Sequence, residues 1–303
     1  MRQRPQSDGT ALTLADHAAA KINLTLRIVG RRPDGYHELV SLVAFAGVGD
    51  ALSLGTGAAL SLRIGGPFSA GLSAADDNLV LRAARELAAR VDGLALGSFS
   101  LTKRLPVASG IGGGSADAAA ALRLLARANG LSPADPRLFA AAGALGADVP
   151  VCVDLRPRVM RGIGEILSEP FALPQLPAVL VNPGVPVETR AVFRALAAAR
   201  GGGGAAPAAD PEPEWGAIRS SAALVEAVAR GRNDLEPVAI SLAPSVAEVL
   251  AVLRAQGGCR LARMSGSGAT CFGLFDTRRA AAAAAQQVRA EHPAWWVQAT
   301  TIG

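Results

Sequence analysis

Hydrophobic and polar positions alternate along parts of the chain and recur every three to four residues in others, and each period predicts a type of element. Residues 21 to 29 alternate, which is typical of a β-strand with one buried face. Its polar side carries Lys21, Asn23, Thr25 and Arg27. Periodicity alone is equally compatible with an ordinary solvated face. Residues 1–16 are polar and irregular, so we expect order to begin near residue 18.

A turn follows this first strand and leads into a second one. Its Pro-Asp-Gly sequence at 33–35 is favourable turn chemistry, and the apolar run 39–45 predicts the next strand. Tyr36 and His37 lie between the turn and this strand. Packing at the edge of a loop is the simpler interpretation of such an aromatic and imidazole pair when it is taken alone.

The sharpest change of pattern is a glycine-rich stretch between a predicted strand, 98–103, and a predicted helix. The stretch reads Gly-Ile-Gly-Gly-Gly-Ser from residue 110 to residue 115, and a run of alanines and leucines follows it. These residues are strong helix formers, and the helix should stop at Asn129 and Gly130. The glycines therefore lie at the amino end of a helix.

Such a helix end favours an anion, because its first N–H groups lack intrahelical partners and the helix dipole adds positive charge. Glycines also let a phosphate come close to the backbone. The stretch is not a P-loop, because Gly114 is followed by Ser115 rather than by Lys-Ser or Lys-Thr, and it lacks the last glycine of a dinucleotide-binding loop. A glycine turn that only lets a helix pack near a strand is the alternative. Four glycines, a serine and a clean helix start together favour a phosphate loop.

The rest of the chain also alternates between helical and extended patterns. Asp77 and Asn78 open a helix, Asp148 lies where a helix gives way to a predicted strand, and Thr189 and Phe193 lie one turn apart on a further helix. Other helices are expected at 133–145, 221–230, 244–256 and 278–291. Strands are expected at 147–153, 178–181 and 295–301, with strand pairs at 158–167 and 262–275. A low-complexity insert covers 197–213, and a proline-rich segment at 170–177 suits a domain boundary.

Composition narrows the class of protein. With 303 residues, 50% hydrophobic and 18% charged, the chain can bury a large core and fits about two domains. The 30 basic residues are nearly balanced by 25 acidic ones, no Lys/Arg block occurs, and aromatic residues make up 4%. These features argue against a nucleic-acid-binding protein and suit a protein with a small polyanionic substrate. No signal peptide or membrane span is indicated. Three scattered cysteines imply no metal site and favour a reducing, cytoplasmic location.

The motif Pro106-x-x-x-Gly-Ile-Gly-Gly-Gly-Ser115 resembles the second signature of the GHMP kinases, which phosphorylate small molecules. The strand–glycine turn–strand at 262–275 resembles their third signature. Ala20-Lys-Ile-Asn-Leu, the Tyr36-His37 turn and Gly146-Ala-Asp-Val-Pro occur in the order seen in one branch of the family, whose acceptor carries a cytidine diphosphate group. The resemblance runs from about residue 20 to the last predicted strand. The insert at 197–213 and the short N-terminal tail are its main departures and touch no motif.

The resemblance implies an α+β fold with two domains, a ribosomal S5 domain 2-like N-terminal domain and a ferredoxin-like α+β C-terminal domain. We expect a tail at 1–17, the first domain with the ATP-phosphate loop at 18–170 and the second domain at 171–303. ATP and Mg²⁺ are the implied cofactors. The implied partner is a small-molecule substrate with a cytidine diphosphate group, and neither nucleic acid nor a membrane is expected. The oligomeric state is left open.

The resemblance also assigns site residues. Asp148 would accept the proton of the attacking hydroxyl, while Lys21 would keep Asp148 charged and screen the phosphoryl oxygens. Ser115 would also be a possible ligand of the Mg²⁺ that arrives with ATP. The ATP phosphates would lie on Pro106, Ala108, Ser109, Gly110, Ile111, Gly112, Gly113, Gly114 and Ser115. The acceptor would lie in a pocket formed by Asn23, Tyr36, His37, Thr189 and Phe193, with two rings around the pyrimidine and the imidazole at its edge.

Two other functions are compatible with part of this pattern. Another GHMP kinase, acting on homoserine, mevalonate or a sugar, would share the glycine loop but has no use for Tyr36 and His37. A non-enzymatic nucleotide- or RNA-binding protein would need neither Asp148 nor Lys21 and would show a basic stripe, which the sequence lacks. Phosphoryl transfer to the cytidyl acceptor separates the three functions.

Overall fold

The computed structural model describes residues 13–57, 59–75, 77–200 and 212–303. Their strands join in one sheet of order β4-β5-β3-β11-β8-β10-β9, and β1, β2 and β6 also pair with β3. Strand β3 (His37–Thr56) is 20 residues long and links both halves of the molecule, since it pairs with β1 (Thr13–Asn23) and, at Ala46, with β11 (Trp296–Ile302). The expected α+β class is confirmed.

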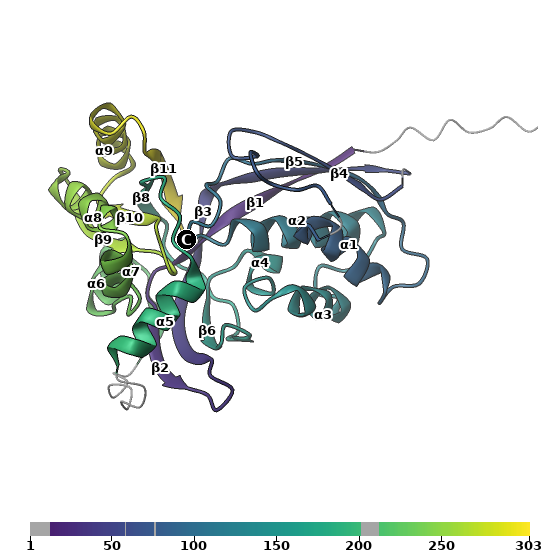
Figure 1. Ribbon diagram of the computed structural model, residues 1–303, viewed down its shortest axis with the longest axis horizontal. Coiled ribbons are helices and arrows are strands. Elements are labelled where there is room, and N and C mark those ends of the chain that lie inside the picture. Colours follow the sequence, from purple (N-terminus) through teal and green to yellow (C-terminus); the bar gives the residue numbers. More distant parts are fainter. Residues whose placement is uncertain (1–12, 58, 76, 201–211) are drawn as a thin grey trace, which may run out of the picture.

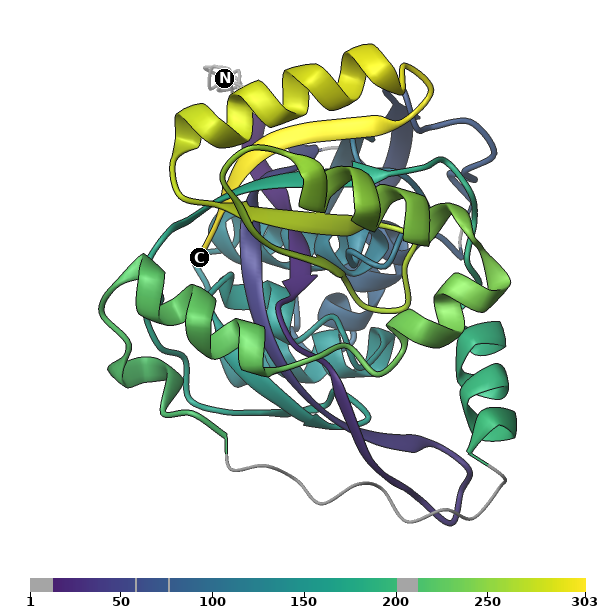
Figure 2. The ribbon, with the colours of Figure 1, turned by 90° about the vertical axis from the view of Figure 1, so that its left-hand side faces the viewer.

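Helices cover the two parts of the sheet separately. In the N-terminal half, α1 to α4 lie on one side of β1, β3, β4 and β5 (Figure 1). In the C-terminal half, α8 and α9 lie together on the outer face of β8 to β11 (Figure 2). The N-terminal half also contains β2 (Arg27–Arg31), β4 (Ser61–Gly65), α1 (Leu79–Ala88), β5 (Gly97–Thr102), α2 (Gly113–Ala128), α3 (Pro136–Leu145), α4 (Val151–Asp154), β6 (Arg158–Gly162) and β7 (Ile166–Leu167). The C-terminal half contains β8 (Leu176–Asn182), α5 (Thr189–Ala199), a 3₁₀ turn (Trp215–Ala217), α6 (Ser221–Arg230), α7 (Glu236–Leu242), α8 (Ser245–Ala255), β9 (Cys259–Met264), β10 (Cys271–Phe275) and α9 (Arg278–Glu291).

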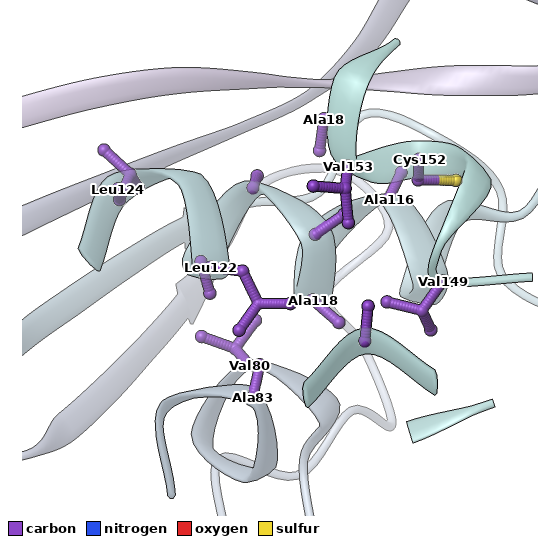
Figure 3. Packing of buried hydrophobic residues seen from close by; sticks show 14 of the residues in the cluster. Ala18, Val80, Ala83, Ala116, Ala118, Leu122, Leu124, Val149, Cys152 and Val153 are labelled. Atoms are coloured by element: carbon purple, nitrogen blue, oxygen red, sulfur yellow. The ribbon is translucent and has the colours of Figure 1, made fainter. Parts of the chain in front are cut away.

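Helix α2 is the central helix of the N-terminal half. Its small alanines let β1 and α1 pack closely around it, and Leu122 and Leu124 have no exposed surface. Leu122 lies near Val80 and Ala83 of α1 in the close view of this core (Figure 3). Since ten of its 16 residues are buried, the helix is held along its length, and its amino end with the glycines has a fixed position.

Three sequence-based predictions of elements were wrong. Residues 21–29 do not form one strand, because β1 ends at Asn23 and β2 begins at Arg27. Order does not begin near residue 18, because β1 starts at Thr13 and pairs with β3 from there. The segment 147–153 is not a strand. Pro150 has helical dihedral angles and opens the short helix α4 (Val151–Asp154), whose apolar side chains pack towards α2. A short apolar run does not distinguish a strand from a buried helical turn, which explains the error.

The two halves share part of their core. One cluster of buried residues lies in the N-terminal half and one lies mainly in the C-terminal half, whereas a third combines Ile22 and Leu42 with Leu180 and Phe272. A domain boundary at residue 170 stays a prediction, and most of the 197–213 insert lies outside the described residues. Among the described residues, no helix is both long and apolar enough to cross a membrane.

Candidate active site

A cavity of about 890 Å³ brings together most of the predicted site residues. Its wall includes the end of β1, the glycine loop and start of α2, the turn before α4, the start of α5 and the turn between β9 and β10. We call it the glycine-loop cavity. The predicted residues on its wall are Lys21, Asn23, Pro106, Ala108, Ser109, Gly110, Gly112, Gly113, Gly114, Ser115, Asp148, Thr189 and Phe193. Ile111, Tyr36 and His37 are not on the wall; Ile111 is fully buried in the core.

The glycine loop has the expected position at the start of α2, and two of its glycines are required by space as well as by conformation. Gly110 and Gly112 have φ angles of 76° and 65°, which side chains rarely adopt. A Cβ atom on Gly110 would lie 2.6 Å from the carbonyl oxygen of Ser265, and one on Gly112 would lie 3.1 Å from Cε of Lys21. The loop therefore packs tightly against both neighbours.

Hydrogen bonds fix the loop between the two halves. The backbone N–H of Thr270 donates to the carbonyl oxygen of Ser109 at 3.1 Å, and the N–H of Lys21 donates to that of Ile111 at 2.9 Å. The buried hydroxyl of Ser265 accepts from the N–H of Asn23 at 3.1 Å and donates to the carbonyl oxygen of Gly110 at 3.2 Å. The β9–β10 turn thus holds the loop against β1.

Lys21 and Asp148 form an ion pair on the cavity wall, with 3.3 Å between Nζ and Oδ1. The Lys21 side chain is 5% exposed and the Asp148 side chain 47% exposed. Lys21 Nζ also donates to Oδ1 of Asn23 at 3.2 Å, and Nδ2 of Asn23 donates to the hydroxyl of Ser41 at 2.7 Å. Lys21 is therefore held rigidly, while the carboxylate of Asp148 is open to a ligand.

A buried charge cluster below the glycine loop was missed in the sequence analysis. Lys103 forms ion pairs with Asp50 and with Asp117, and both carboxylates are nearly inaccessible. Burial and the neighbouring Asp50 outweigh Lys103 and raise the pKa of Asp117 to about 7. For Lys103, burial lowers the pKa but the two carboxylates outweigh it, so the pKa is raised overall. The available signal in the sequence was Asp117, an acidic residue within the alanine run of a predicted helix, because a buried carboxylate needs a charged partner.

The predicted acceptor residues do not all meet. The rings of His37, the first residue of β3, and Phe193 of α5 stack with centroids 5.3 Å apart. Burial, then Arg31 and Arg200, lower the pKa of His37. Tyr36 is 61% exposed, so packing at the edge of a loop describes His37 but not Tyr36. On the cavity wall, the hydroxyl of Thr189 bonds to that of Ser267 at 2.8 Å.

This geometry defines a class of protein. Backbone N–H groups at a helix start bind phosphate, and an open carboxylate beside a buried lysine can take a proton from a hydroxyl while the lysine screens negative charge. Together they suit transfer of a phosphoryl group from a nucleotide to a small alcohol, which needs little beyond positioning and charge neutralisation. The site is that of a small-molecule kinase.

Comparison with known proteins agrees with this class. Residues 78–154 match the GHMP kinases N terminal domain and residues 215–294 match GHMP kinases C terminal. The chain belongs to the GHMP kinase family.

Curated relatives and solved structures extend this result. The 4-diphosphocytidyl-2-C-methyl-D-erythritol kinase of Rhodopseudomonas palustris is 57% identical over 98% of this chain and 99% of its own length. The protein of the same name from Methylobacterium radiotolerans is 57% identical over 95% of this chain and 99% of its own length. A crystal structure of 4-(cytidine 5'-diphospho)-2C-methyl-D-erythritol kinase matches with a TM-score of 0.73 and 36% identity, covering 96% of this chain and 99% of that one. Homoserine kinase from Cytophaga hutchinsonii, at 18% identity, a TM-score of 0.66 and coverage of 99% and 98% of the two chains, shares the fold.

Proposed function

We propose that this protein transfers the γ-phosphate of ATP to the 2-hydroxyl of 4-diphosphocytidyl-2-C-methyl-D-erythritol, a step of the non-mevalonate route to isoprenoid precursors. The observation that carries the proposal is the Lys21–Asp148 pair, which lies on the same cavity wall as the glycine loop. The relatives named above support the choice of acceptor. Transfer of labelled phosphate from ATP to this acceptor, with one product equivalent per ADP formed, tests it.

In this mechanism the glycine loop binds the ATP phosphates. The N–H groups of the first turn of α2 lack intrahelical acceptors and lie next to the cavity, as does the side chain of Ser115. Because Gly110 and Gly112 pack against Ser265 and Lys21, the loop is formed before ATP arrives. Such preorganisation lowers the entropic cost of binding.

Magnesium fits this site as a companion of the nucleotide. The described residues contain no cluster of three carboxylate, histidine or cysteine side chains that would hold a metal by itself. Mg²⁺ typically uses one or two protein ligands in addition to phosphates and waters. Ser115 on the cavity wall, together with the unpartnered Oδ1 of Asp117, offers suitable oxygens. When bound, the ion would neutralise charge on the phosphates.

Asp148 acts as the general base and Lys21 as the electrostatic partner. The exposed carboxylate of Asp148 takes the proton from the acceptor hydroxyl as the oxygen attacks the γ-phosphorus atom. Lys21 is held by Asn23 and does not need to move, so its charge lies ready for the developing negative charge.

The cytidine group binds on the α5 side of the cavity. Phe193 and Thr189 are on the wall there, and His37 stacks on Phe193. We place the pyrimidine against this stacked pair and assign the exposed ring of Tyr36 to its other face. This arrangement differs from the one expected from the sequence, in which Phe193 and Tyr36 formed the sandwich and His37 read only the edge of the base.

The alternative is a GHMP kinase with another acceptor. The homoserine kinase and the mevalonate kinase from L. major, at 18% and 15% identity, show the common fold and do not favour either substrate. Parallel assays with the cytidyl acceptor, homoserine and mevalonate decide between them. Turnover confined to homoserine or mevalonate refutes the proposal.

We also place the enzyme in the cytoplasm. All three cysteines are free thiols, in agreement with a reducing compartment. Recovery of activity in the soluble cytoplasmic fraction of cells tests this location.

A further inference from the structure

A second cavity of about 720 Å³ lies in the C-terminal half, away from the glycine loop, and shares no lining residue with the first. Its wall comes from α5, the segment before α7 and the first turn of α7, the end of α8 and strand β9. Apolar side chains contribute a large part of this wall, among them Leu196, Pro237, Val238 and Leu261. The charged residues on the wall are Arg200, Arg232, Arg254, Arg260, Arg263, Asp234 and Glu236. We call it the arginine cavity.

The two carboxylates of the arginine cavity are already engaged. Oδ2 of Asp234 accepts the N–H of Ile28 at 2.8 Å, and Oδ1 accepts Nε of Arg232 at 2.5 Å. Oε2 of Glu236 accepts the N–H of Met264 at 2.8 Å. Asp234 also forms an ion pair with Arg200 at 3.3 Å, so this carboxylate partly balances Arg200 and Arg232. Arg254, Arg260 and Arg263 remain, with Glu236 as the other carboxylate on the wall.

Three of the arginines have at most a weak ion pair with a carboxylate of the cavity wall. Arg263 is 6% exposed and donates only to backbone carbonyl oxygens, those of Leu24, Val228 and Gly231. Burial lowers the pKa of Arg263 to about 10, which leaves it charged at neutral pH. The side chain of Arg254 is 57% exposed and 3.9 Å from Glu236, and that of Arg260 is 60% exposed and pairs with Asp276, which lies outside the lining.

We propose that the arginine cavity is a binding site for a small phosphate-bearing anion, separate from the site of phosphoryl transfer. Arg254 and Arg260 would take the phosphate oxygens, because their guanidinium groups are exposed, weakly paired and shaped for bidentate bonds to phosphate. The apolar wall formed by Val238 and Leu261 suits an organic group attached to the phosphate.

The walls of the two cavities are connected through short contacts. Nδ2 of Asn233, on the arginine cavity, donates at 2.8 Å to the carbonyl oxygens of Met264 and Gly266, and Gly266 is on the wall of the glycine-loop cavity. Arg263 donates at 2.8 Å to the carbonyl oxygen of Leu24, the residue after the end of β1. An occupant of the arginine cavity therefore lies one residue away from segments that form the catalytic site.

Cys259 provides a local test, because it is on the wall of the arginine cavity and is the only one of the three cysteines that is partly exposed. Burial raises the pKa of all three thiols, Cys259 included, but Cys152 and Cys271 are buried, so partial exposure distinguishes Cys259 from them. With inorganic pyrophosphate as the probe, we expect the rate of thiol labelling at Cys259, located by peptide mass mapping, to fall about fivefold or more at saturation. The variant Arg254→Ala/Arg260→Ala should label at a rate that pyrophosphate does not change.

The control is Arg63→Ala/Arg82→Ala, which removes the same charge from exposed positions on β4 and α1 that line neither cavity. It should keep full protection of Cys259. Unchanged labelling of the wild-type protein, protection that persists in Arg254→Ala/Arg260→Ala, or equal loss of protection in the control would overturn the proposal.

Titration calorimetry provides a readout that does not use the thiol. With an unreactive ATP analogue and cytidine diphosphate present in excess, pyrophosphate should still bind the wild-type protein and the control. Binding should fall at least tenfold in Arg254→Ala/Arg260→Ala. The test does not depend on the proposed acceptor, since a chain that phosphorylates another alcohol would give the same result. Loss of pyrophosphate binding when those ligands are added would place the anion on the glycine loop and refute a separate site.

Discussion

Asp148 and Lys21 touch each other but differ in exposure, and this difference predicts different effects of mutation. Asp148→Asn keeps the size of the side chain and removes the proposed proton acceptor, so kcat should fall by at least ~10² while the affinity for both substrates stays close to normal. Steady-state kinetics and calorimetric titration measure the two effects. Asp92→Asn, at an exposed turn outside the cavity, is the control and should be unchanged. A near-normal kcat for Asp148→Asn would contradict its role as the base.

Lys21 should act mainly on the transition state, because Asn23 already fixes its Nζ atom and its side chain is 5% exposed. Lys21→Met keeps the aliphatic length and removes the charge, so kcat should fall more than KM rises. An increase in KM with kcat unchanged would make Lys21 a binding residue only.

Phe193 and Tyr36 are predicted to contact the cytosine ring. Aromatic stacking on a base is worth roughly 1–3 kcal/mol, so Phe193→Ala or Tyr36→Ala should weaken cytidyl-substrate binding about tenfold and leave ATP binding unchanged. Since Tyr36 is 61% exposed, its loss should hardly change the melting temperature. Phe171→Ala, at a partly buried ring outside the glycine-loop cavity, is the control and should lower stability without selective loss of cytidyl binding. Equal weakening of both ligands in Phe193→Ala would refute the base contact.

Asp117 predicts a pH dependence of stability. Its pKa in the folded protein, about 7, lies above its ordinary value of 3.8, so between these values the folded state binds more protons than the unfolded state. The free energy of unfolding contributed by this group therefore falls as pH rises from about 4 through about 7. Asp117→Asn removes the titration, and urea titrations at pH 5 and pH 8 should show a smaller decrease in the variant. An unchanged decrease would show that Asp117 does not titrate in this range.

At the scale of elements, the strand–loop–helix unit from β5 to α2 predicts how the glycine loop responds to added methyl groups. Gly110→Ala and Gly112→Ala place a side chain on residues with a left-handed backbone. On Gly110 the added Cβ would lie 2.6 Å from the carbonyl oxygen of Ser265, so the loop must shift, and on Gly112 it would lie 3.1 Å from the Lys21 side chain, which must give way. ATP affinity should fall by about tenfold or more, and cytidyl binding should fall less. Gly143→Ala in α3 has open space and an ordinary φ angle, and it should leave both affinities unchanged. Equal losses of both affinities in the loop variants would make the loop purely structural.

Local patterns predicted most elements because local physics determines them. The helices at 221–230 and 278–291 have the predicted ends, since Ser220 and Thr277 cap their first turns through side-chain hydrogen bonds. The apolar pattern at 147–153 is also local, but whether this segment forms a strand or a helical turn depends on its packing against α2. A strand was therefore predicted where α4 lies. Strand β4 and helix α7 were not foreseen either.

The site was predictable where a motif coincided with a helix start and less so where distant segments meet. Lys21 and Asp148 are 127 positions apart, and only the family resemblance indicated that they would lie together. The Asp50–Lys103–Asp117 cluster and the β9–β10 turn that holds the loop depend on tertiary contacts with no short sequence signature. The stacking of His37 on Phe193 also depends on how the β2–β3 hairpin lies beside α5.

At the scale of the molecule, the shared core predicts a single cooperative unfolding transition. Strand β3 pairs with strands of both halves, and the third cluster combines buried residues from each. All three tryptophans, Trp215, Trp295 and Trp296, lie in the C-terminal half, so their fluorescence reports on that half, whereas far-ultraviolet circular dichroism reports on the whole chain. The two signals should have the same midpoint in a urea titration.

A core mutation in the N-terminal half makes this last prediction sharper. Leu122 lies in α2, is fully buried and belongs to the first cluster, which contains no tryptophan. Leu122→Ala should destabilise the fold by about 2–5 kcal/mol and, if the halves unfold together, should move the tryptophan midpoint to lower urea as far as the circular dichroism midpoint. Val249→Ala, in the cluster of the C-terminal half, tests the coupling in the opposite direction. A tryptophan transition that stays in place in Leu122→Ala would show that the halves unfold independently, despite the sheet they share.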